Sequence, residues 1–358
     1  MIPYYILALL PPVVSYLIFS NKEQQKKRTK LMLMLFFGVF LFLVSCRAVS
    51  VGVDNSKYTY IYETIANTSF NKVTNIIDIE AGFIYFSKII SMISEEYQLL
   101  VFVVALISVI PIAVMCIKES ENGLLTIALF LSVAPFSIYF SALRQVLAVA
   151  FIVPAYYLTK HKKLIWFVLT VAIAMLFHQS AFIILLIYPL YHVRLTGNKF
   201  LFIVPAIVLV YVFNQPIFRF LLTLMGDRYD ERYGSELTNA IMMILLFAIF
   251  VAFSFFMVDD KKLEKDTIGL RNLLVVALIL QLFAPVSNVA MRINYYFIPF
   301  IPILMPKIIN RSKPQYRQIA ILAHVVMCIF FIVYFFYDAH TTVDGGVMKI
   351  FPYKFMWE

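Results

Sequence analysis

Two arginines interrupt apolar stretches of the chain, and each has polar neighbours. Arg144 lies in the string Ser-Ala-Leu-Arg-Gln, and Arg292 lies in the string Met-Arg-Ile-Asn-Tyr-Tyr. A planar guanidinium with a permanent charge can bind a phosphate or pyrophosphate through two parallel hydrogen bonds. Each arginine alone fits equally well as a helix-end side chain that reaches the lipid headgroups. Because both are predicted below to lie on one face of the protein, together they favour anion binding.

Two further ionisable groups are candidate general bases. His178 interrupts an apolar stretch in the string Leu-Phe-His-Gln-Ser-Ala, and imidazole can accept a proton near neutral pH. A histidine that caps a broken helix is the alternative, and no Asp or Cys at close spacing indicates a hydrolytic triad. Glu80 opens the string Glu-Ala-Gly-Phe, where a carboxylate can stabilise a helix N-terminus or act as a base.

A polar stretch at about 47–97 mixes carboxylates, amides and tyrosines. Such groups suit sugar hydroxyls because they combine hydrogen bonds with aromatic faces. For any single residue of the stretch, an ordinary polar loop is the alternative interpretation. The candidates for sugar binding or for support of the site, taken from this stretch and from the neighbours of the two arginines, are Arg47, Asp54, Tyr58, Gln145, Tyr295 and Tyr296.

The cysteines do not indicate a metal site. Cys46, Cys116 and Cys328 each lie in or at the edge of an apolar run, and no CxxC or Cys/His spacing links them. Packing among apolar side chains is their ordinary use. We therefore expect neither a metal nor a cofactor.

The elements that position these groups must lie in a membrane. Hydrophobic residues make up 62% of the chain and charged residues only 14%, and the mean hydropathy is +0.87. A water-soluble globule could not cover its surface with so little charge. The net charge of +10 lies in short clusters between apolar runs, which is typical of topology determinants, so we expect no nucleic-acid partner.

The apolar runs predict an all-α polytopic bundle that forms a single integral-membrane domain over 1–358. A helix needs roughly 20 apolar residues to cross the hydrocarbon, and the runs predict about 12 spans. The short runs at about 145–159, 164–177 and 180–192 predict tilted or broken helices. The segment 81–93 is too short to cross and predicts a re-entrant or interfacial helix. The remaining spans are expected at about 2–20, 31–49, 98–117, 123–142, 200–217, 239–258, 273–291, 295–309 and 318–337.

The basic clusters predict which side each loop faces. The positive-inside rule places the cluster 22–30 in the cytoplasm, and alternation then does the same for 160–163, 261–271 and 307–317. The outer face receives the loop at about 47–97, Arg144, His178, Arg292 and the tail at about 338–358. The functional groups are therefore predicted to gather outside the cytoplasm.

These strings, in this order, resemble the EpsG-like family of bacterial polysaccharide-assembly membrane proteins, which are related in role to Wzy polymerases. One departure is Ala81, where the family pattern leads us to expect proline. The strings that carry the resemblance are Arg47 with Val51-Gly52-Val53-Asp54 and Tyr58, then Glu80-Ala81-Gly82-Phe83, Leu143-Arg144-Gln145 with Ala148, Phe177-His178-Gln179-Ser180-Ala181, Arg292-Ile293-Asn294-Tyr295-Tyr296-Phe297 and Pro352-Tyr353.

The resemblance implies a glycosyltransferase with a GT-C-like bundle in the bacterial cytoplasmic (inner) membrane. Such a protein polymerises repeat units of O-antigen, capsule or exopolysaccharide at the outer leaflet, on the periplasmic or external side. Its expected partners are repeat units on undecaprenyl or another polyprenyl pyrophosphate, the growing polysaccharide, membrane lipid, a chain-length regulator and a flippase. Arg144 and Arg292 would grip the leaving pyrophosphate without a metal, and His178 or Glu80 would serve as base.

Three other readings compete with a polymerase. A flippase or exporter of lipid-linked oligosaccharide would need a polar path through the midplane and internal repeat symmetry, and the sequence suggests neither. A membrane acyltransferase would need a donor site on the inner side, where the loops are merely basic. A non-catalytic scaffold of a polysaccharide synthase complex remains open.

Overall fold

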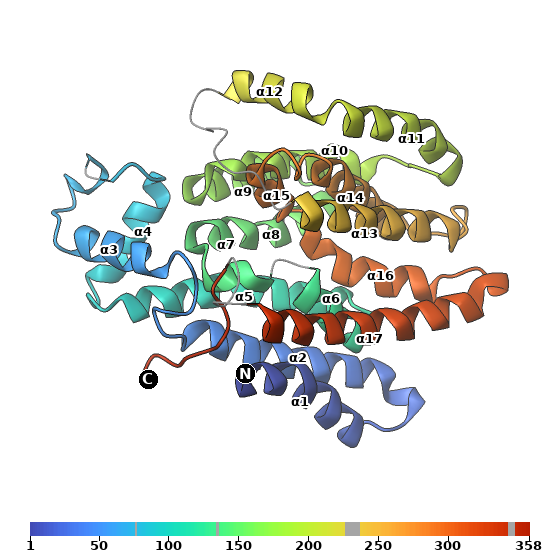
Figure 1. The fold of residues 1–358 in the computed structure, drawn as a ribbon, viewed down its shortest axis with the longest axis horizontal. Coiled ribbons are helices and arrows are strands. Elements are labelled where there is room, and N and C mark those ends of the chain that lie inside the picture. Colours follow the sequence, from blue (N-terminus) through green and yellow to red (C-terminus); the bar gives the residue numbers. More distant parts are fainter. Residues whose placement is uncertain (76, 134–135, 226–236, 343–347) are drawn as a thin grey trace. The chain divides into compact units, whose positions relative to one another are not determined.

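The described part of the chain is helical, as the sequence predicts. The computed structural model describes residues 1–75, 77–133, 136–225, 237–342 and 348–358, and Figure 1 shows their helices. Within these ranges the β-structure is limited to two isolated bridges, Arg47 with Phe355 and Val258 with Ser312. The chain packs as two compact units, of which the first joins Met1–Leu185 to Val325–Glu358 and the second is Leu186–His324.

The first unit contains the segments that carry most of the predicted site. In it α2 packs against both α1 and α5, and α4 packs against α3, α5 and α9. Its helices are α1 (Ile2–Ile18), α2 (Gln25–Ser45), α3 (Asn55–Ala66), α4 (Ala81–Ser91), α5 (Tyr97–Glu119), α6 (Gly123–Ser132), α7 (Leu143–Ala150), α8 (Ile152–Lys160), α9 (Leu164–Phe177) and the part of α17 (Arg317–Thr341) that begins at Val325.

Aromatic rings fill the interior of this unit. Phe36 and Phe40 of α2 meet Phe130 of α6 edge-on, with ring centroids 5.7 and 5.4 Å apart. Tyr4 of α1 is buried and lies edge-on to Phe140, at 6.3 Å. Edge-to-face rings pack densely and add to the energy of apolar burial, so the aromatic core fixes α1, α2 and α6 against one another.

The second unit is built around α14, which is buried along most of its length. It packs against α10, α13, α15 and α16. The helices of this unit are α10 (Ile187–His192), α11 (Gly197–Val212), α12 (Asn214–Met225), α13 (Leu237–Phe256), α14 (Lys265–Gln281), α15 (Asn288–Asn294) and α16 (Ile301–Asn310), together with the start of α17.

The number of spans is only partly supported. Among the described residues, α2, α5 and the stretch Pro314–Thr341 are long and apolar enough to cross a membrane, and the pair α11 and α12, bent by 78°, would make a fourth span. About 12 spans is therefore not confirmed. Of the three short runs predicted to be tilted or broken helices, two are broken: 145–159 divides into α7 and α8, and 180–192 into a 3-10 helix and α10. The third, 164–177, forms the continuous helix α9.

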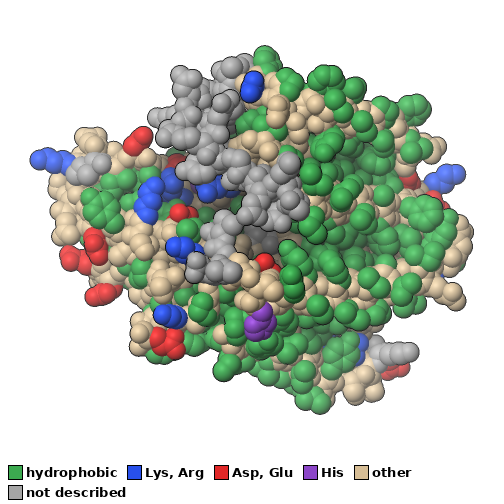
Figure 2. Space-filling view, viewed as in Figure 1, with side chains coloured by type: hydrophobic (Ala, Val, Ile, Leu, Met, Phe, Trp, Pro, Cys, Tyr) green, Lys and Arg blue, Asp and Glu red, His purple; other side chains and the backbone are tan. Residues whose placement is uncertain are grey.

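The described surface is apolar to a degree that suits lipid. Hydrophobic side chains cover much of the face seen in Figure 2, most continuously on its right, and most of the charged side chains visible there lie in its left half. Exposed apolar residues recur along individual helices, for example Ile165, Leu169 and Ile173 of α9. Helices that are apolar on their outer face are expected where the solvent is hydrocarbon.

One arginine of the second unit is buried and paired. Arg271 of α14 has no exposed surface, lies 3.9 Å from the ring centroid of Phe255 and donates to the Leu195 carbonyl at 2.7 Å. Its Nη2 lies 2.7 Å from Oδ1 of Asp260, whose other oxygen accepts from the N–H of Gly197 at 2.6 Å. This cluster joins α14 to the start of α11 and to the loop between α13 and α14.

Asp260→Asn should destabilise the protein by about 3 kcal/mol, because it leaves Arg271 charged and buried without an acid. Glu264→Gln is the matched control: it removes the carboxylate from an ion pair with Arg311 whose Glu264 side chain is 62% exposed, and should cost at most about 1 kcal/mol. Unfolding by SDS in mixed micelles, followed by helical circular dichroism, measures both. Equal losses would contradict a structural role for the Arg271 cluster.

Candidate functional site

Arg144 is held by side chains from two other helical segments. It lies in the first turn of α7, and its Nη1 forms an ion pair with Oε2 of Glu80, the residue that precedes α4. Its Nε donates to the hydroxyl of Tyr58 on α3, at 3.3 Å. The Arg144 and Glu80 side chains are 26% and 19% exposed. The guanidinium is therefore oriented by two partners and still reaches the surface.

The second oxygen of Glu80 ties the pair to the segment that holds His178. Oε1 of Glu80 accepts from the backbone N–H of Gln179 at 3.1 Å. Nδ1 of His178 lies 2.8 Å from Oγ of Ser180 and 3.3 Å from its backbone nitrogen. Four of the residues predicted from sequence thus lie together: Tyr58, Glu80, Arg144 and His178.

A glycine makes this meeting possible. The N-terminal end of α4 approaches the C-terminal end of α9 so closely that a Cβ on Gly82 would lie 2.4 Å from the Leu176 carbonyl oxygen. One turn further along, the ring of Phe86 packs edge-on against that of Phe177, at 5.8 Å. The glycine in Glu-Ala-Gly-Phe is therefore required by packing, and it brings Glu80 within reach of the Gln179 N–H.

The surroundings of Glu80 favour its ionised form and make it a poor proton acceptor. Burial would raise the pKa of this carboxyl, but the Arg144 guanidinium, the Gln179 N–H and the charge of His178 together lower it below its ordinary value. A carboxylate with a lowered pKa and both oxygens engaged is a weak proton acceptor. Its geometry is that of a group that orients Arg144.

Sequence reasoning missed Asn55, which anchors α3 beside the site. Asn55 is 1% exposed, and its Nδ2 donates to the carbonyls of Val51 and Phe140, the latter at 3.1 Å. Its Oδ1 accepts from the hydroxyl of Tyr97 at 3.1 Å. One turn along α3, Tyr58 meets Arg144. The available signal was an asparagine directly after the string Val-Gly-Val-Asp, since asparagine commonly makes local backbone bonds at turns and helix starts.

Gly52 allows the same loop to approach the Phe140 carbonyl closely. Its φ is +115°, a conformation that L side chains rarely adopt, and a Cβ there would lie 1.9 Å from the Phe140 carbonyl oxygen. The glycine lets the loop before α3 press against the turn before α7. The string Val-Gly-Val-Asp is therefore explained by backbone packing.

The other predicted residues of the first unit lie around this cluster. Arg47 is 1% exposed, donates to the Val44 carbonyl and pairs with Phe355 through the backbone, so it supports the fold beneath the surface. Asp54 is half-buried and directly precedes α3. Gln145 is 3% exposed within α7. Of the two roles predicted for Arg47, sugar binding or support, its burial favours support.

Arg292 and its neighbours belong to the second unit. Arg292 is exposed on α15, whereas Tyr295 and Tyr296 are buried. Asn294 is fully buried and donates to the Ala277 carbonyl at 2.9 Å and to Oε1 of Gln281 at 3.0 Å. The string Arg-Ile-Asn-Tyr-Tyr thus combines one exposed cation with a buried anchor, and a shared grip by Arg144 and Arg292 remains a prediction.

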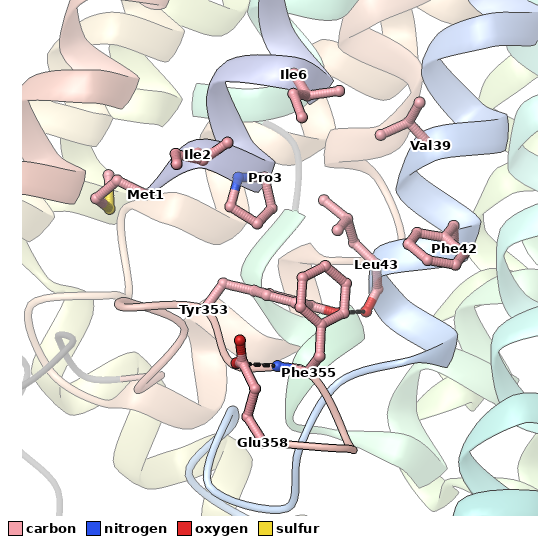
Figure 3. Close-up of a pocket in the computed structure, with 10 residues that line it drawn as sticks. All are labelled: Met1, Ile2, Pro3, Ile6, Val39, Phe42, Leu43, Tyr353, Phe355 and Glu358. Carbon is pink, nitrogen blue, oxygen red and sulfur yellow. Dashed lines mark hydrogen bonds between the residues drawn. The ribbon is translucent and has the colours of Figure 1, made fainter.

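A pocket of about 460 Å³ lies in the first unit, between α1, α2 and the C-terminal segment (Figure 3). None of the predicted site residues lines it, and its polar groups are largely engaged: Tyr353 donates to the Leu43 carbonyl at 2.8 Å, and Glu358 accepts from the Phe355 N–H at 2.8 Å. Its lining is Met1, Ile2, Pro3, Ile6, Val39, Phe42, Leu43, Tyr353, Phe355 and Glu358.

Metal ligands do not gather in the part of the chain that the structure describes. Within it, no three His, Cys, Asp or Glu side chains lie close enough together to hold an ion. The three cysteines are unpaired thiols, and Cys116 and Cys328 are buried.

The described chain is helical and of the membrane type, and it brings an oriented arginine, a carboxylate and a histidine together at helix ends. Comparison with known proteins makes the class specific: the model of the EpsG family matches residues 30–355, so the chain belongs to that family. It is thus a polysaccharide-assembly membrane protein. No curated protein and no solved structure matches the chain.

Gly82→Ala should disrupt the meeting of α4 and α9, because the new methyl group would meet the carbonyl group and the Cβ of Leu176, which cannot move without the α9 backbone. We expect a loss of about 2 kcal/mol or more in the free energy of unfolding. Gly38→Ala is the matched control, since nothing lies within 4 Å of a Cβ at Gly38 in the middle of α2. That change should be neutral or stabilising by up to about 1 kcal/mol. Similar effects of the two would refute the close-approach explanation.

The Glu80–Arg144 pair should make stability depend on acid. The folded pKa of Glu80 is lowered, so its contribution is complete above the unfolded value of about 4.3 and disappears as the pH falls through the folded pKa. At neutral pH, Glu80→Gln should cost about 2 kcal/mol. The difference in unfolding free energy between wild type and variant should shrink as the pH falls below about 4. A difference that is constant from pH 7 to pH 3 would exclude an ionised pair.

Proposed function

We propose that this protein is a polysaccharide polymerase of the Wzy type, a glycosyltransferase that acts on polyprenyl-pyrophosphate-linked repeat units at the outer leaflet. An acceptor sugar hydroxyl attacks the anomeric carbon of the donor glycan. The bond from that carbon to the pyrophosphate oxygen breaks, and polyprenyl pyrophosphate leaves with the electron pair. The observation that carries this proposal is the orientation of Arg144 by Glu80 and Tyr58.

Arg144 is assigned to the leaving group. The pyrophosphate gains negative charge in the transition state, and a cation already fixed in place stabilises it without reorganising. The bonds to Glu80 and Tyr58 engage Nη1 and Nε of Arg144, so Nη2 is the nitrogen that we assign to a pyrophosphate oxygen. Arg292, which is exposed on α15, is assigned to the same anion on the strength of its sequence context.

His178 is the better candidate for the base. Both oxygens of Glu80 are engaged and its pKa is lowered, whereas the His178 ring is half-buried beside Ser180. The backbone N–H of Ser180 can only donate, so its 3.3 Å contact makes Nδ1 an acceptor and puts the ring proton on Nε2; the Ser180 hydroxyl, at 2.8 Å, can donate to Nδ1 as well. To act as base, His178 switches to the opposite tautomer, in which Nδ1–H donates to Oγ of Ser180 and Nε2 takes the proton of the acceptor hydroxyl.

The surface of α4 supports a site at the membrane interface. Tyr85, Ile89 and Met92 are 39%, 57% and 74% exposed and follow helical spacing. Lys88 turns inward instead, donating to two carbonyls at the end of α3 at 3.2 and 2.9 Å. An uncharged, exposed apolar stripe is typical of a helix lying in the headgroup boundary. Glu80 directly precedes this helix, and this supports a grip at the depth of a lipid-linked pyrophosphate.

The predicted topology supplies the rest of the proposal. The site then faces the outside of a bacterial cytoplasmic membrane, where lipid-linked O-antigen, capsule or exopolysaccharide units are joined. A chain-length regulator and a flippase are proposed partners. The chemistry needs no metal, because the guanidinium charge can neutralise the pyrophosphate.

The deciding experiment is a size-resolved polymerisation assay. Purified protein is given polyprenyl-pyrophosphate-linked repeat units from the same gene neighbourhood, without metal and with EDTA. Wild type should produce a ladder, and Arg144→Ala should reduce its rate by about 10²–10³-fold because it removes transition-state stabilisation. Arg292→Ala should act in the same direction, and His178→Ala should cost about 10²-fold or more. Arg311→Ala, in a predicted inner loop, is the control and should keep its rate.

Each outcome has a definite meaning. Full activity of Arg144→Ala would discard the pyrophosphate grip. A ladder that disappears with EDTA and returns with a divalent cation would discard metal-independent transfer. Wild-type protein that neither transfers nor hydrolyses the donor would move the assignment to an exporter or a scaffold.

A further inference from the structure

The described C-terminal segment, Met348–Glu358, lies along the loop from α2 to α3. The backbone N–H of Gly52 donates to the Lys349 carbonyl at 2.9 Å, and that of Ala48 donates to the Lys354 carbonyl at 3.0 Å. In return, the N–H of Met356 donates to the Cys46 carbonyl at 2.9 Å. We call Met348–Glu358 the C-terminal strap.

Side chains fasten the strap to the body of the first unit. The hydroxyl of Tyr4 donates to the Ile350 carbonyl, and that of Tyr353 donates to the Leu43 carbonyl at 2.8 Å. Ile350, Phe351 and Tyr353 are each only 6 or 7% exposed. The middle of the strap is therefore buried in the first unit, although the segment is irregular.

The first residue of the strap reaches the turn that precedes Arg144. Oγ of Ser141 donates to the Met348 carbonyl at 3.1 Å and accepts from the Val53 N–H at 3.1 Å. The Val53 N–H also lies 3.1 Å from the Met348 carbonyl. Ser141 has no exposed surface, and α7 begins two residues after it. One buried hydroxyl thus joins the strap, the loop before α3 and the start of α7.

We propose that the C-terminal strap is a positioning element for Arg144, and that it acts through Ser141. This inference rests on the proposed function. Asn55 binds the Phe140 carbonyl and so holds α3 against the turn before α7. Ser141, the next residue of that turn, binds the strap. Arg144 is then presented to Tyr58 and Glu80 from a turn held on two sides. The strap is a positioning element because its described contact with the turn before α7 runs through Ser141.

We expect the strap to affect the position of the Arg144 guanidinium more than the stability of the protein. A guanidinium displaced by about 1 Å can lose about 10²-fold in rate while the protein remains folded. Ser141→Ala would remove both contacts of Oγ but leave the direct bond between Val53 and Met348. The variant therefore releases the turn before α7 without detaching the strap.

The test is a double-mutant cycle with a matched serine. Ser141→Ala should lower kcat for polymerisation of lipid-linked repeat units by about 10-fold in wild type, and by less than about 2-fold in an Arg144→Lys background, with KM little changed. Ser132→Ala is the control, because Oγ of Ser132 on α6 donates to the Phe331 carbonyl of α17 at 2.6 Å and not to the turn before α7. It should have no effect on kcat. An equal loss from Ser141→Ala in both backgrounds would overturn positioning through Arg144.

Hydrogen exchange supplies a readout that does not depend on activity. In Ser141→Ala, the amides of peptides covering 55–62 and 143–150 should exchange at least about 10-fold faster, while peptides from α5 stay unchanged. Unchanged exchange at 143–150 would overturn the proposal even if activity fell. If wild type makes no polymer but exchange rises as expected, the proposed function fails and the structural role of the strap stands.

Discussion

The ion pair between Arg144 and Glu80 is the constraint on which the rest of the first unit depends. A charge at the end of an apolar bundle is costly unless it is paired and hydrogen-bonded. Pairing these residues requires the ends of α4, α7 and α9 to meet. That meeting requires a glycine at position 82 and a backbone N–H at Gln179 aimed at the second carboxylate oxygen. The packing of the ends of α4, α7 and α9 is therefore tied to the pairing of the Arg144 charge with Glu80.

The burial of three arginines distinguishes the two that support the fold from the one whose side chain can reach a ligand. Arg271 has no exposed surface and is neutralised by Asp260 within its own unit, so it fastens loops. Arg47 is also buried and lies beneath the C-terminal strap. Arg144 has a carboxylate partner as well, but its side chain keeps 26% of its surface exposed. A cation that is both oriented and accessible can act on a ligand, whereas a buried one stabilises the fold.

The turn before α7 concentrates the supports of the site. Asn55 and Gly52 contact the Phe140 carbonyl, and Ser141 binds the strap. These contacts are buried and neutral, so they hold the turn without adding charge. A charged side chain on a short helix needs such support, because eight residues of α7 cannot fix their own orientation.

The sequence alone determined the helical membrane class, the break at 145–159 and the identity of most polar residues in the site. These follow from composition, local periodicity and the cost of charge in lipid, all of which are written along the chain. The tertiary structure decided which groups act together. Glu80 and Tyr58 are 64 and 86 residues from Arg144, and Met348 is 207 from Ser141. No local pattern encodes such distant contacts, so only the fold could change Glu80 from a candidate base into the partner of Arg144 and reveal Asn55 and Ser141.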